Sequence, residues 1–542
     1  MTTPYEEGNP ESKICILGEA PARSEVRLGR PLVGPSGQLL ETCMHSAKMV
    51  RRECYLLNIF EVQVVKDKTG NTVRDEGGDI LWTKKDGLTL KGQEMSEHAF
   101  QRLSNCGANV VVPLGGTALS CVFGDSRILK WRGSILNGGE HIAKKKLVPT
   151  VHPAACLRGQ YLWRHLLISD LDRAKRESKS PELNLLRRNI ITGPSFSDVM
   201  AYLKDCLELP AVAFDIEVIN HQVHCISFAK SPTECMSVPL VKDSGADYFS
   251  LEQEEEIWMA ITAILRDSKI MKIGQNLIFD ISFLLQQMNI HTSGPVGDTM
   301  ILHHIMFPDF PKGLDFLCSM HTDIPYYKDD GKMHRGAGGD IKIFWQYNAK
   351  DSVAAFDLWN SLSEEAEKQG FMQTYLDTVE MFPSLLYMMI RGFGIDKDRL
   401  EATKKEVEEK IKEKEDELSK VADHEFNPAS PKQCQEYFYI HKGIKPYISR
   451  TTGRPTTDDK AMSRIYRRYN LPEAKLVQEI RALNKLQGTY LEVQFDKDGM
   501  LRCSYNPRGA TTGRLSSSKT IFGTGLNMQN LHPDFKGFLV AT

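Results

Sequence analysis

Four carboxylates in the middle of the sequence have the types and spacing of a metal-dependent hydrolytic site. Asp215 and Glu217 lie two apart in the apolar run "FDIEV", so in a strand both side chains point to one face. In "KIGQNLIFD" a strand leads into a helix that carries Asp280. In "YNAKD" Tyr347 and Asp351 are four apart and share one face of a helix. Three elements therefore bring four acids toward one pocket.

Four neighbouring carboxylates cannot all stay ionised without cations, because like charges raise each other's pKa. Two magnesium or manganese ions would solve this problem, and such a pair activates a water and stabilises the leaving oxygen of a phosphodiester. A tyrosine one turn from a metal ligand can hold the attacking water. Acid pairs near strand ends are often ordinary surface residues, but the combination of the three motifs in this order favours the two-metal site.

These stretches resemble the proofreading 3′–5′ exonuclease domain of family A DNA polymerases, the tyrosine-type DEDD exonucleases with an RNase H-like fold. The resemblance implies that Tyr347 orients the nucleophilic water and that Asn276 and Phe279 contact DNA. Asp298, in the following "GDTMILHHIMF", is expected to cap a helix rather than to bind metal. The implied ligands of two Mg²⁺ or Mn²⁺ ions are Asp215, Glu217, Asp280 and Asp351.

The C-terminal stretch "TTGRLSSS…LNMQN" is similar to the first polymerase motif of the same family. An Arg between glycine and polar residues suits phosphate or minor-groove contact, and amides suit the acceptors of the minor groove. The resemblance implies DNA contacts at Arg514, Asn527, Gln529 and Asn530. In that family an apolar strand such as "FLVAT" leads to the first catalytic aspartate of the palm. We therefore expect an incomplete palm, and polymerisation would need a second polypeptide that supplies palm and fingers, unless the chain is a truncation.

The first 175 residues alternate short apolar runs, polar loops and amphipathic stretches, the pattern of a parallel α/β sheet. Ligands of such sheets bind at the carboxyl ends of the strands. "KICILGEAP", "YLLNIF", "NVVVPLGGTAL" and "KLVPTVHPAA" each place a polar or glycine residue there. We expect Glu19, Asn58, Gly115 and His152 to converge on one cleft.

This region resembles the uracil-DNA glycosylase superfamily, particularly its family 4. The resemblance implies that Glu19 positions water, Asn58 reads a base edge and His152 stabilises the departing base, after the nucleotide has been flipped out of the stack. Leu32 stands where the family has the aromatic that stacks on that base. The family's four cluster-binding cysteines are missing, so no iron–sulfur cluster is expected. An active glycosylase and a non-catalytic DNA-binding domain both remain open.

These motifs require an α/β multidomain chain. We expect a uracil-DNA glycosylase-like α/β domain at 1–180, an RNase H-like exonuclease domain at 181–375, and a mostly helical thumb with the start of an incomplete palm at 376–542. The basic segment 172–184 is interpreted as a linker. Apolar residues at near-heptad spacing predict a long amphipathic helix, and they are Leu400, Val407, Ile411, Leu418 and Val421.

The length, the charge balance and the cysteine spacing limit the classes of protein to which the chain can belong. The length of 542 residues suggests about three or four domains. With 68 basic against 70 acidic residues, any nucleic-acid surface must be local. No two of the 12 cysteines lie closer than ten residues apart, which indicates a reduced cytosolic protein. A signal peptide and an apolar run of about 20 residues are both missing, so no membrane partner is expected and the location is cytoplasmic, in the host cell if phage-encoded.

The sequence thus predicts the N-terminal part of a family A DNA polymerase acting in replication. Its own activity would be 3′–5′ exonuclease cleavage at a single-stranded 3′ end, and it would also bind primer-template DNA. Two alternatives stay open. In the first, the chain is a non-catalytic DNA-clamping subunit of a split polymerase. In the second, it removes bases from DNA through its N-terminal domain.

Overall fold

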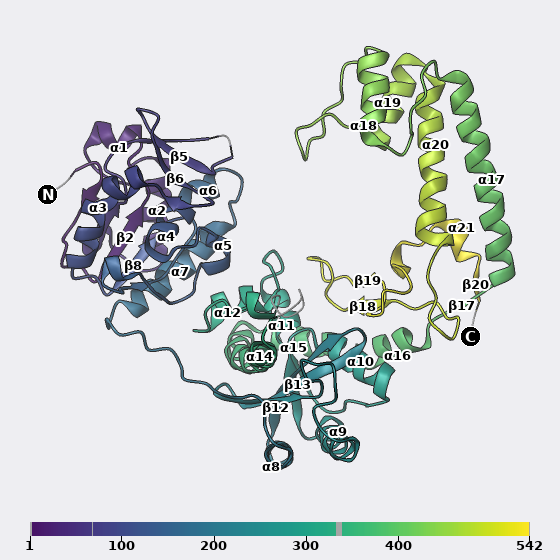
Figure 1. Cartoon of the computed structure of the whole chain (residues 1–542), viewed down its shortest axis with the longest axis horizontal. Coiled ribbons are helices and arrows are strands. Elements are labelled where there is room, and N and C mark those ends of the chain that lie inside the picture. The colour runs from purple at the N-terminus through teal and green to yellow at the C-terminus, as the bar shows by residue number, and fades with distance from the viewer. Residues whose placement is uncertain (1–2, 68, 332–338, 541–542) are drawn as a thin grey trace. The chain divides into compact units, whose positions relative to one another are not determined.

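The computed structural model describes residues 3–67, 69–331 and 339–540, and Figure 1 shows the whole chain. The chain divides into two compact units. One comprises Met1–Leu277 and His291–Gln373, and the other comprises Ile278–Ile290 and Thr374–Thr542. The expected boundary at 375/376 lies close to the division after Gln373, whereas the boundary at 180/181 lies inside the first unit.

The first sheet has six strands in the order β1-β3-β2-β8-β10-β9. The four inner strands pair in parallel and the two edge strands pair antiparallel, which confirms the expected parallel core. The strands are β1 (Glu6–Glu7), β2 (Ile14–Gly18), β3 (Tyr55–Asn58), β8 (Val110–Pro113), β9 (Leu136–Asn137) and β10 (Lys146–Leu147).

Alternate residues of the inner strands face two separate apolar cores, as the period of a strand requires. Cys15 and Leu17 pack with residues of α3 and α4, and Ile16 and Val112 pack with residues of α2 and α7. The helices are α1 (Arg23–Leu28), α2 (Pro35–Ser46), α3 (Leu90–Asn105), α4 (Gly116–Phe123), α5 (Ile128–Trp131), α6 (Pro153–Leu157) and α7 (Trp163–Glu177).

Helix α7 corrects the linker expected at 172–184. It continues to Glu177 because Arg173 and Ala174 are buried in the core. A small antiparallel sheet after β3 was not foreseen. Its strands are β4 (Val64–Lys66), β5 (Thr72–Asp75), β6 (Ile80–Thr83) and β7 (Gly87–Leu88).

The second sheet has the order β11-β14-β13-β12-β15-β16 and is mixed. Strands β12 and β13 form an antiparallel hairpin, and β15 pairs in parallel with β12. The strands are β11 (Asn189–Ile191), β12 (Ala211–Ile219), β13 (Gln222–Ser231), β14 (Glu234–Pro239), β15 (Met271–Gly274) and β16 (Val296–Asp298).

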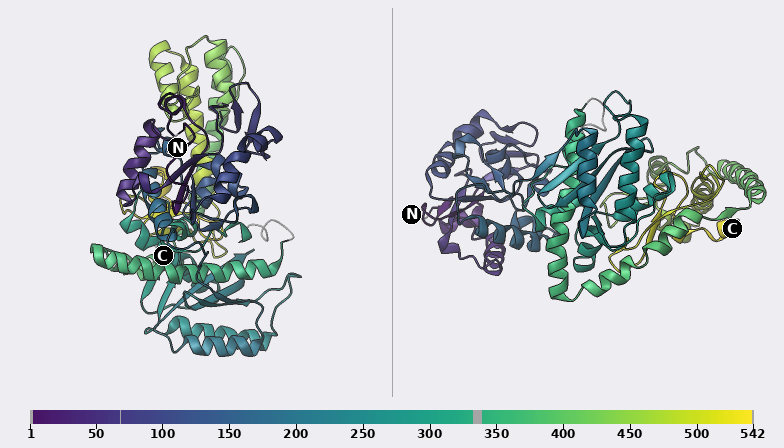
Figure 2. Two further views of the ribbon diagram at one scale, coloured as in Figure 1. Left: turned by 90° about the vertical axis from the view of Figure 1, so that its left-hand side faces the viewer. Right: turned by 90° about the horizontal axis from the view of Figure 1, so that it is seen from below.

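Helices cover both faces of this sheet, and Figure 2 shows the long α14 (Ile341–Gln369) across one face with α9 on the other. Capping boxes at Ser195 and Ser250 start α8 and α9. The remaining helices of this region are α8 (Phe196–Cys206), α9 (Leu251–Arg266), α11 (Thr299–Met306) and α12 (Leu314–His321). Helix α10 (Leu277–Met288) follows β15 in the chain, and from Ile278 on it belongs to the second unit.

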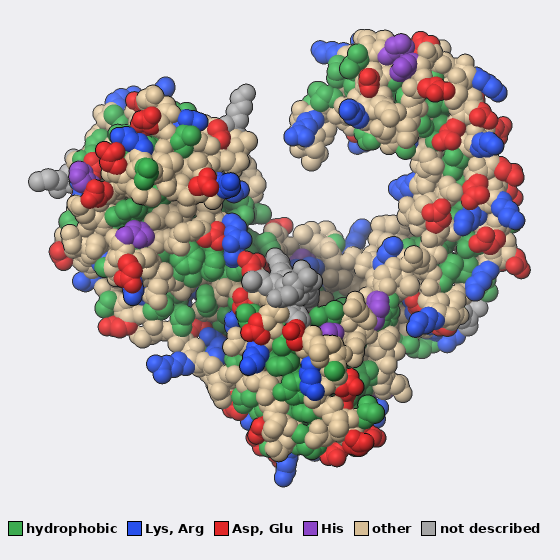
Figure 3. All heavy atoms as spheres, viewed as in Figure 1, with side chains coloured by type: hydrophobic (Ala, Val, Ile, Leu, Met, Phe, Trp, Pro, Cys, Tyr) green, Lys and Arg blue, Asp and Glu red, His purple; other side chains and the backbone are tan. Residues whose placement is uncertain are grey.

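The second unit contains the long amphipathic helix that the near-heptad spacing predicted. Helix α17 buries four of the five expected residues, while Val421 at its last position is 42% exposed. Acidic and basic side chains lie along its outer side in Figure 3. The elements are α15 (Met372–Val379), α16 (Phe382–Arg391), β17 (Gly394–Ile395), α17 (Lys397–Val421), α18 (Pro431–Gln435), α19 (Asp459–Tyr469), α20 (Pro472–Leu486), β18 (Ser504–Asn506), β19 (Ser516–Ser518), α21 (Pro533–Lys536) and β20 (Leu539–Val540).

The apolar C-terminal stretch forms the short strand β20, which pairs antiparallel with β17. Ala541 and Thr542, the last letters of "FLVAT", lie outside the described residues. Across the described part of the chain, no helix combines the length and the apolar character that crossing a membrane requires.

Candidate active site

Three of the four expected carboxylates form one cluster. Ligand oxygens of Asp215, Glu217 and Asp351 lie within 4.8 Å of one another, and Glu217 and Asp351 are buried. Asp215 and Glu217 therefore lie on one face of β12, as their spacing predicted. The pairing of β12 with β13 shifts its register between Glu217 and Val218, next to the cluster. Converging carboxylate oxygens are the ligands that magnesium and manganese prefer, so these residues fit a divalent cation.

Asn348, which the sequence reasoning missed, fixes the orientation of Asp215. Its Nδ2 donates to the backbone oxygen of Asp215 at 3.0 Å and to its Oδ2 at 2.9 Å. Its Oδ1 accepts a hydrogen bond from Ser237 Oγ at 2.9 Å. Asn348 is fully buried between α14 and the sheet. The only signal in the sequence was its place directly after Tyr347.

Tyr347 and Asp351 project from the same face of α14, and a second tyrosine and a lysine meet them there. Lys328 Nζ lies 2.5 Å from Asp351 Oδ2 and donates to the Tyr347 hydroxyl at 3.0 Å. Tyr327 donates its hydroxyl to Asp351 Oδ1 at 2.7 Å. Burial, followed by the charge of Asp351, raises the pKa of Tyr347, so its phenol keeps its proton at neutral pH.

Burial by itself lowers the pKa of Lys328, but the nearby Asp351 and Tyr347 outweigh it and the net pKa is raised. The lysine is therefore a full positive charge beside the cluster. Neither Tyr327 nor Lys328 could be predicted from the sequence, because both come from a loop and have no regular spacing relative to the acids.

The other expected exonuclease residues lie at the junction of β15 and α10. Asp280 is buried on α10, and the cluster found among the described residues does not include it. Asn276 has a positive φ of 61° and starts the turn into the helix, and Phe279 follows, half-buried. Asp298 caps α11 by accepting the N–H groups of Met300 and Ile301, as predicted.

Asp298 also accepts the N–H groups of Asn276 and Leu277, so one carboxylate orders the starts of two helices. Its burial raises the pKa of Asp298 to about 6, against the opposing effect of these backbone hydrogen bonds. Asp298 is thus a structural carboxylate that joins β16, α10 and α11.

Three of the four residues expected in the N-terminal cleft line one pocket of about 530 Å³, namely Glu19, Gly115 and His152. Lys66 from β4 enters the same pocket and pairs with Glu19 at 2.6 Å. Burial lowers the pKa of His152 to about 4, although Glu19 opposes the shift. Asn58 ends β3 opposite Gly18, is 2% exposed and does not line this pocket.

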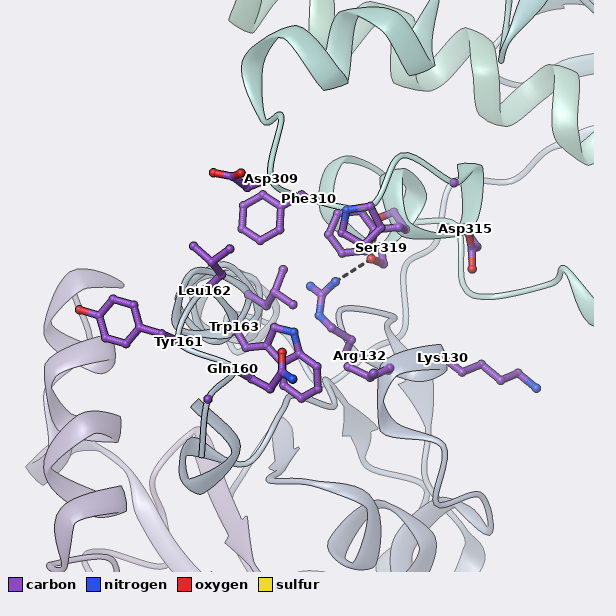
Figure 4. A pocket seen from close by; sticks show the side chains of 16 residues that line it. Lys130, Arg132, Gln160, Tyr161, Leu162, Trp163, Asp309, Phe310, Asp315 and Ser319 are labelled. Atoms are coloured by element: carbon purple, nitrogen blue, oxygen red, sulfur yellow. Dashed lines mark hydrogen bonds between the residues drawn. The ribbon is translucent and has the colours of Figure 1, made fainter. Parts of the chain in front are cut away.

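A larger cavity of about 590 Å³ lies within the first unit between α7 and the loop that precedes α12 (Figure 4). Its walls are mostly apolar, with Trp163, Leu166, Phe310 and Phe316 among them. At its edge the buried Arg132 donates to Ser319 Oγ at 2.8 Å, the hydrogen bond drawn in Figure 4. No sequence motif indicated this cavity.

The residues expected to contact primer-template DNA lie in and after the β18–β19 hairpin. Arg514, Gln529 and Asn530 are exposed. Asn527 is half-buried, and its Oδ1 accepts hydrogen bonds from Ser517 Oγ at 2.7 Å and from the Gln529 N–H at 3.0 Å. Asn527 thus also orders the loop that presents its neighbours.

Three family models match consecutive parts of the chain. They are the uracil DNA glycosylase superfamily at 5–167, a 3′–5′ exonuclease at 195–367 and DNA polymerase family A at 397–533. With the carboxylate cluster, they define a multidomain chain of the DNA-processing enzymes. In chain order, the chain thus carries a region similar to uracil-DNA glycosylases, a region similar to 3′–5′ exonucleases and a region similar to family A DNA polymerases, and its curated relatives include DNA polymerase I and phage DNA polymerases.

The chain is 28% identical over 352 residues to DNA polymerase I of Pseudomonas aeruginosa, covering 61% of this chain and 38% of that protein. It is 22% identical over 608 residues to the DNA polymerase of Bacillus phage SP01, covering 95% of this chain and 62% of that protein. It is 28% identical over 174 residues to the type-4 uracil-DNA glycosylase of Thermotoga maritima, covering 31% of this chain and 79% of that protein.

Among solved structures, the POL domain of Pol1 from M. smegmatis, in complex with DNA primer-template and dNTP, aligns with a TM-score of 0.47 at 17% identity over 64% of this chain and 56% of that chain. The chain thus spans about two fifths to three fifths of the two curated polymerases compared above. The second polypeptide expected from the sequence finds no support in these comparisons.

Proposed function

We propose that the chain hydrolyses DNA from its 3′ end and holds primer-template DNA during replication, as a family A DNA polymerase. The observation that carries the proposal is the cluster of Asp215, Glu217 and Asp351 beside Tyr347. The exonuclease family match over 195–367 includes all four residues.

Asp215, Glu217 and Asp351, with Asp280 as the fourth proposed ligand, would hold two magnesium or manganese ions. When bound, such ions supply an activated water and stabilise the leaving oxygen of the terminal phosphodiester. Tyr347 keeps its proton and donates a hydrogen bond that orients this water. Asn348 holds Asp215 in the rotamer that faces the cluster.

Asn276 and Phe279 would contact the single-stranded 3′ end, and the exposed Arg514, Gln529 and Asn530, together with Asn527, would contact primer-template DNA. Guanidinium and amide groups suit phosphates and minor-groove acceptors. Because the chain spans only part of the length of the curated polymerases, nucleotide addition by the polymerase is a proposal too, and so is its location in the cytoplasm.

Base removal by the N-terminal domain is a second candidate, favoured by the pocket that joins Glu19 and His152. It predicts abasic sites in uracil-containing DNA and their loss in Asn58→Ala. If wild-type reactions produce no abasic sites, the N-terminal domain is a DNA-binding module.

The exonuclease proposal is tested with Asp215→Ala. We expect the purified variant to lose magnesium-dependent digestion of single-stranded DNA, because a metal ligand is removed. Asp205→Ala changes an exposed aspartate that pairs with Lys230 and is the matched control, which should digest DNA at the wild-type rate. Undiminished digestion by Asp215→Ala would refute the assignment.

A further inference from the structure

The ammonium group of Lys328 lies where a metal cation would bind to Asp351. Its Nζ is 2.5 Å from Asp351 Oδ2, while the other carboxylate oxygen accepts the hydroxyl of Tyr327. A carboxylate oxygen that accepts one hydrogen bond keeps a lone pair for a metal ion. An ammonium group at ion-pair distance is different, because it repels a divalent cation at the same oxygen.

The surroundings hold the ammonium group in this place. The Lys328 side chain is 19% exposed, and its Nζ also donates to the Tyr347 hydroxyl. The Nζ atom lies 4.7 Å from the ring centroid of Tyr347 and 5.4 Å from that of Tyr327. Two aromatic faces and two oxygens thus stabilise one positive charge.

The residues on either side of Tyr327 and Lys328 contact the N-terminal region of the same compact unit. Asp329 accepts a 2.6 Å ion pair from Lys130 and a hydrogen bond from Tyr326 at 3.0 Å. Lys130 lies 4.7 Å from the Tyr326 ring centroid, and Trp131 packs edge-on against the same ring. The segment 326–329 therefore joins the end of α5 to the carboxylate cluster.

We propose that Lys328 neutralises Asp351 while the exonuclease centre is free of metal, and that a divalent ion binds by displacing it. The inference rests on the proposed exonuclease function and adds a positioning residue to it. Lys130, through Asp329, keeps the lysine within reach of the carboxylate. The N-terminal domain thereby sets the metal affinity of the exonuclease centre.

The test is direct Mn²⁺ binding to the full chain without DNA, measured from the electron paramagnetic resonance signal of free Mn²⁺. In Lys328→Met the competing charge is gone, and we expect Mn²⁺ to bind about tenfold tighter. Lys328→Arg keeps the charge and should stay close to wild type. Lys368→Met, further along α14, removes an exposed lysine that pairs with Glu364 and is the matched control.

Equal Mn²⁺ affinity in wild type and Lys328→Met would overturn the proposal. Asp215→Ala separates this failure from that of the proposed function. If Asp215→Ala loses Mn²⁺ binding while Lys328→Met is unchanged, only the lysine's role is wrong. If Asp215→Ala binds Mn²⁺ as wild type does, the exonuclease centre itself is wrong.

Lys130→Met tests the connection to the N-terminal region. We expect it to tighten Mn²⁺ binding in the same direction as Lys328→Met but by less, because Lys328 keeps its contacts with Asp351 and Tyr347. Lys144→Met, which removes an exposed lysine paired with Glu140, is its control. An unchanged affinity in Lys130→Met would overturn the part assigned to the N-terminal domain.

Discussion

At the scale of single residues, the candidate centre depends on Asn348 as well as on its acids. We expect Asn348→Ala to weaken Mn²⁺ binding and exonuclease turnover by about 10–100-fold, because Asp215 loses the donor that orients it. The measurements are Mn²⁺ titration and digestion of single-stranded DNA. Ser352→Ala removes another buried hydrogen bond of α14, to Ser227 at 2.6 Å, without touching Asp215. Equal losses in both variants would reduce Asn348 to a stabilising role.

The residues that could be predicted from the sequence are those related by a period. Asp215 and Glu217 are two apart in a strand, and Tyr347 and Asp351 are four apart in a helix, so spacing alone placed each pair on one face. Lys328 comes from a loop, where no period relates sequence to direction. Asn348 follows Tyr347, but only the packing of α14 on β12 turns its amide toward Asp215.

At the scale of elements, two buried histidines make the stability of the α11–α12 region depend on pH. The rings of His303 and His321 lie 5.5 Å apart, and burial lowers their pKa values to about 3 and about 4. In the unfolded chain both titrate near 6.5, so acid adds protons to the unfolded state first. The folding stability that the two neutral histidines contribute is fully present above about pH 6.5. It is lost as the pH falls toward 4, by up to about 1.4 kcal/mol per pH unit for each histidine.

His303→Leu tests this linkage. We expect the thermal midpoint of the variant to fall less between pH 7.5 and pH 5 than that of wild type, because one of the two titrating groups is absent. Differential scanning calorimetry at the two pH values gives the comparison. An identical fall in both proteins would show that acid acts elsewhere.

Elements were predictable where one face is apolar and the other solvated. Helix α17 has that pattern, and its buried residues follow it, apart from Val421 at the end. The linker expected at 172–184 was wrong in its first half for the opposite reason. Its charged residues read as solvated, yet Arg173 is buried and donates to carbonyls of a segment about 150 residues further along the chain. Tertiary contacts of this kind leave no local pattern.

At the scale of the whole molecule, buried arginines join the N-terminal region to the exonuclease region in one compact unit. Arg132 pairs with Asp170 and donates to Ser319 Oγ. Arg173 donates to the backbone oxygens of Thr322 at 2.6 Å and Met320 at 3.2 Å. Because these carbonyls are held by one guanidinium, the end of α12 should depend on α7 for its order.

Arg173→Met keeps the length and apolar stem of the side chain but removes its donors. Each buried carbonyl left without a partner costs about 1–3 kcal/mol, so we expect faster amide exchange around α12 and a lower thermal midpoint. Arg176→Met, on the same helix with a side chain 62% exposed, is the matched control and should exchange as wild type does. Hydrogen exchange read by mass spectrometry resolves residues 311–322 separately from helices α17 and α20, whose exchange should not change. If α12 exchanged at the wild-type rate in Arg173→Met, the two regions would be independent domains, and Lys130 would have no stable frame from which to hold Lys328.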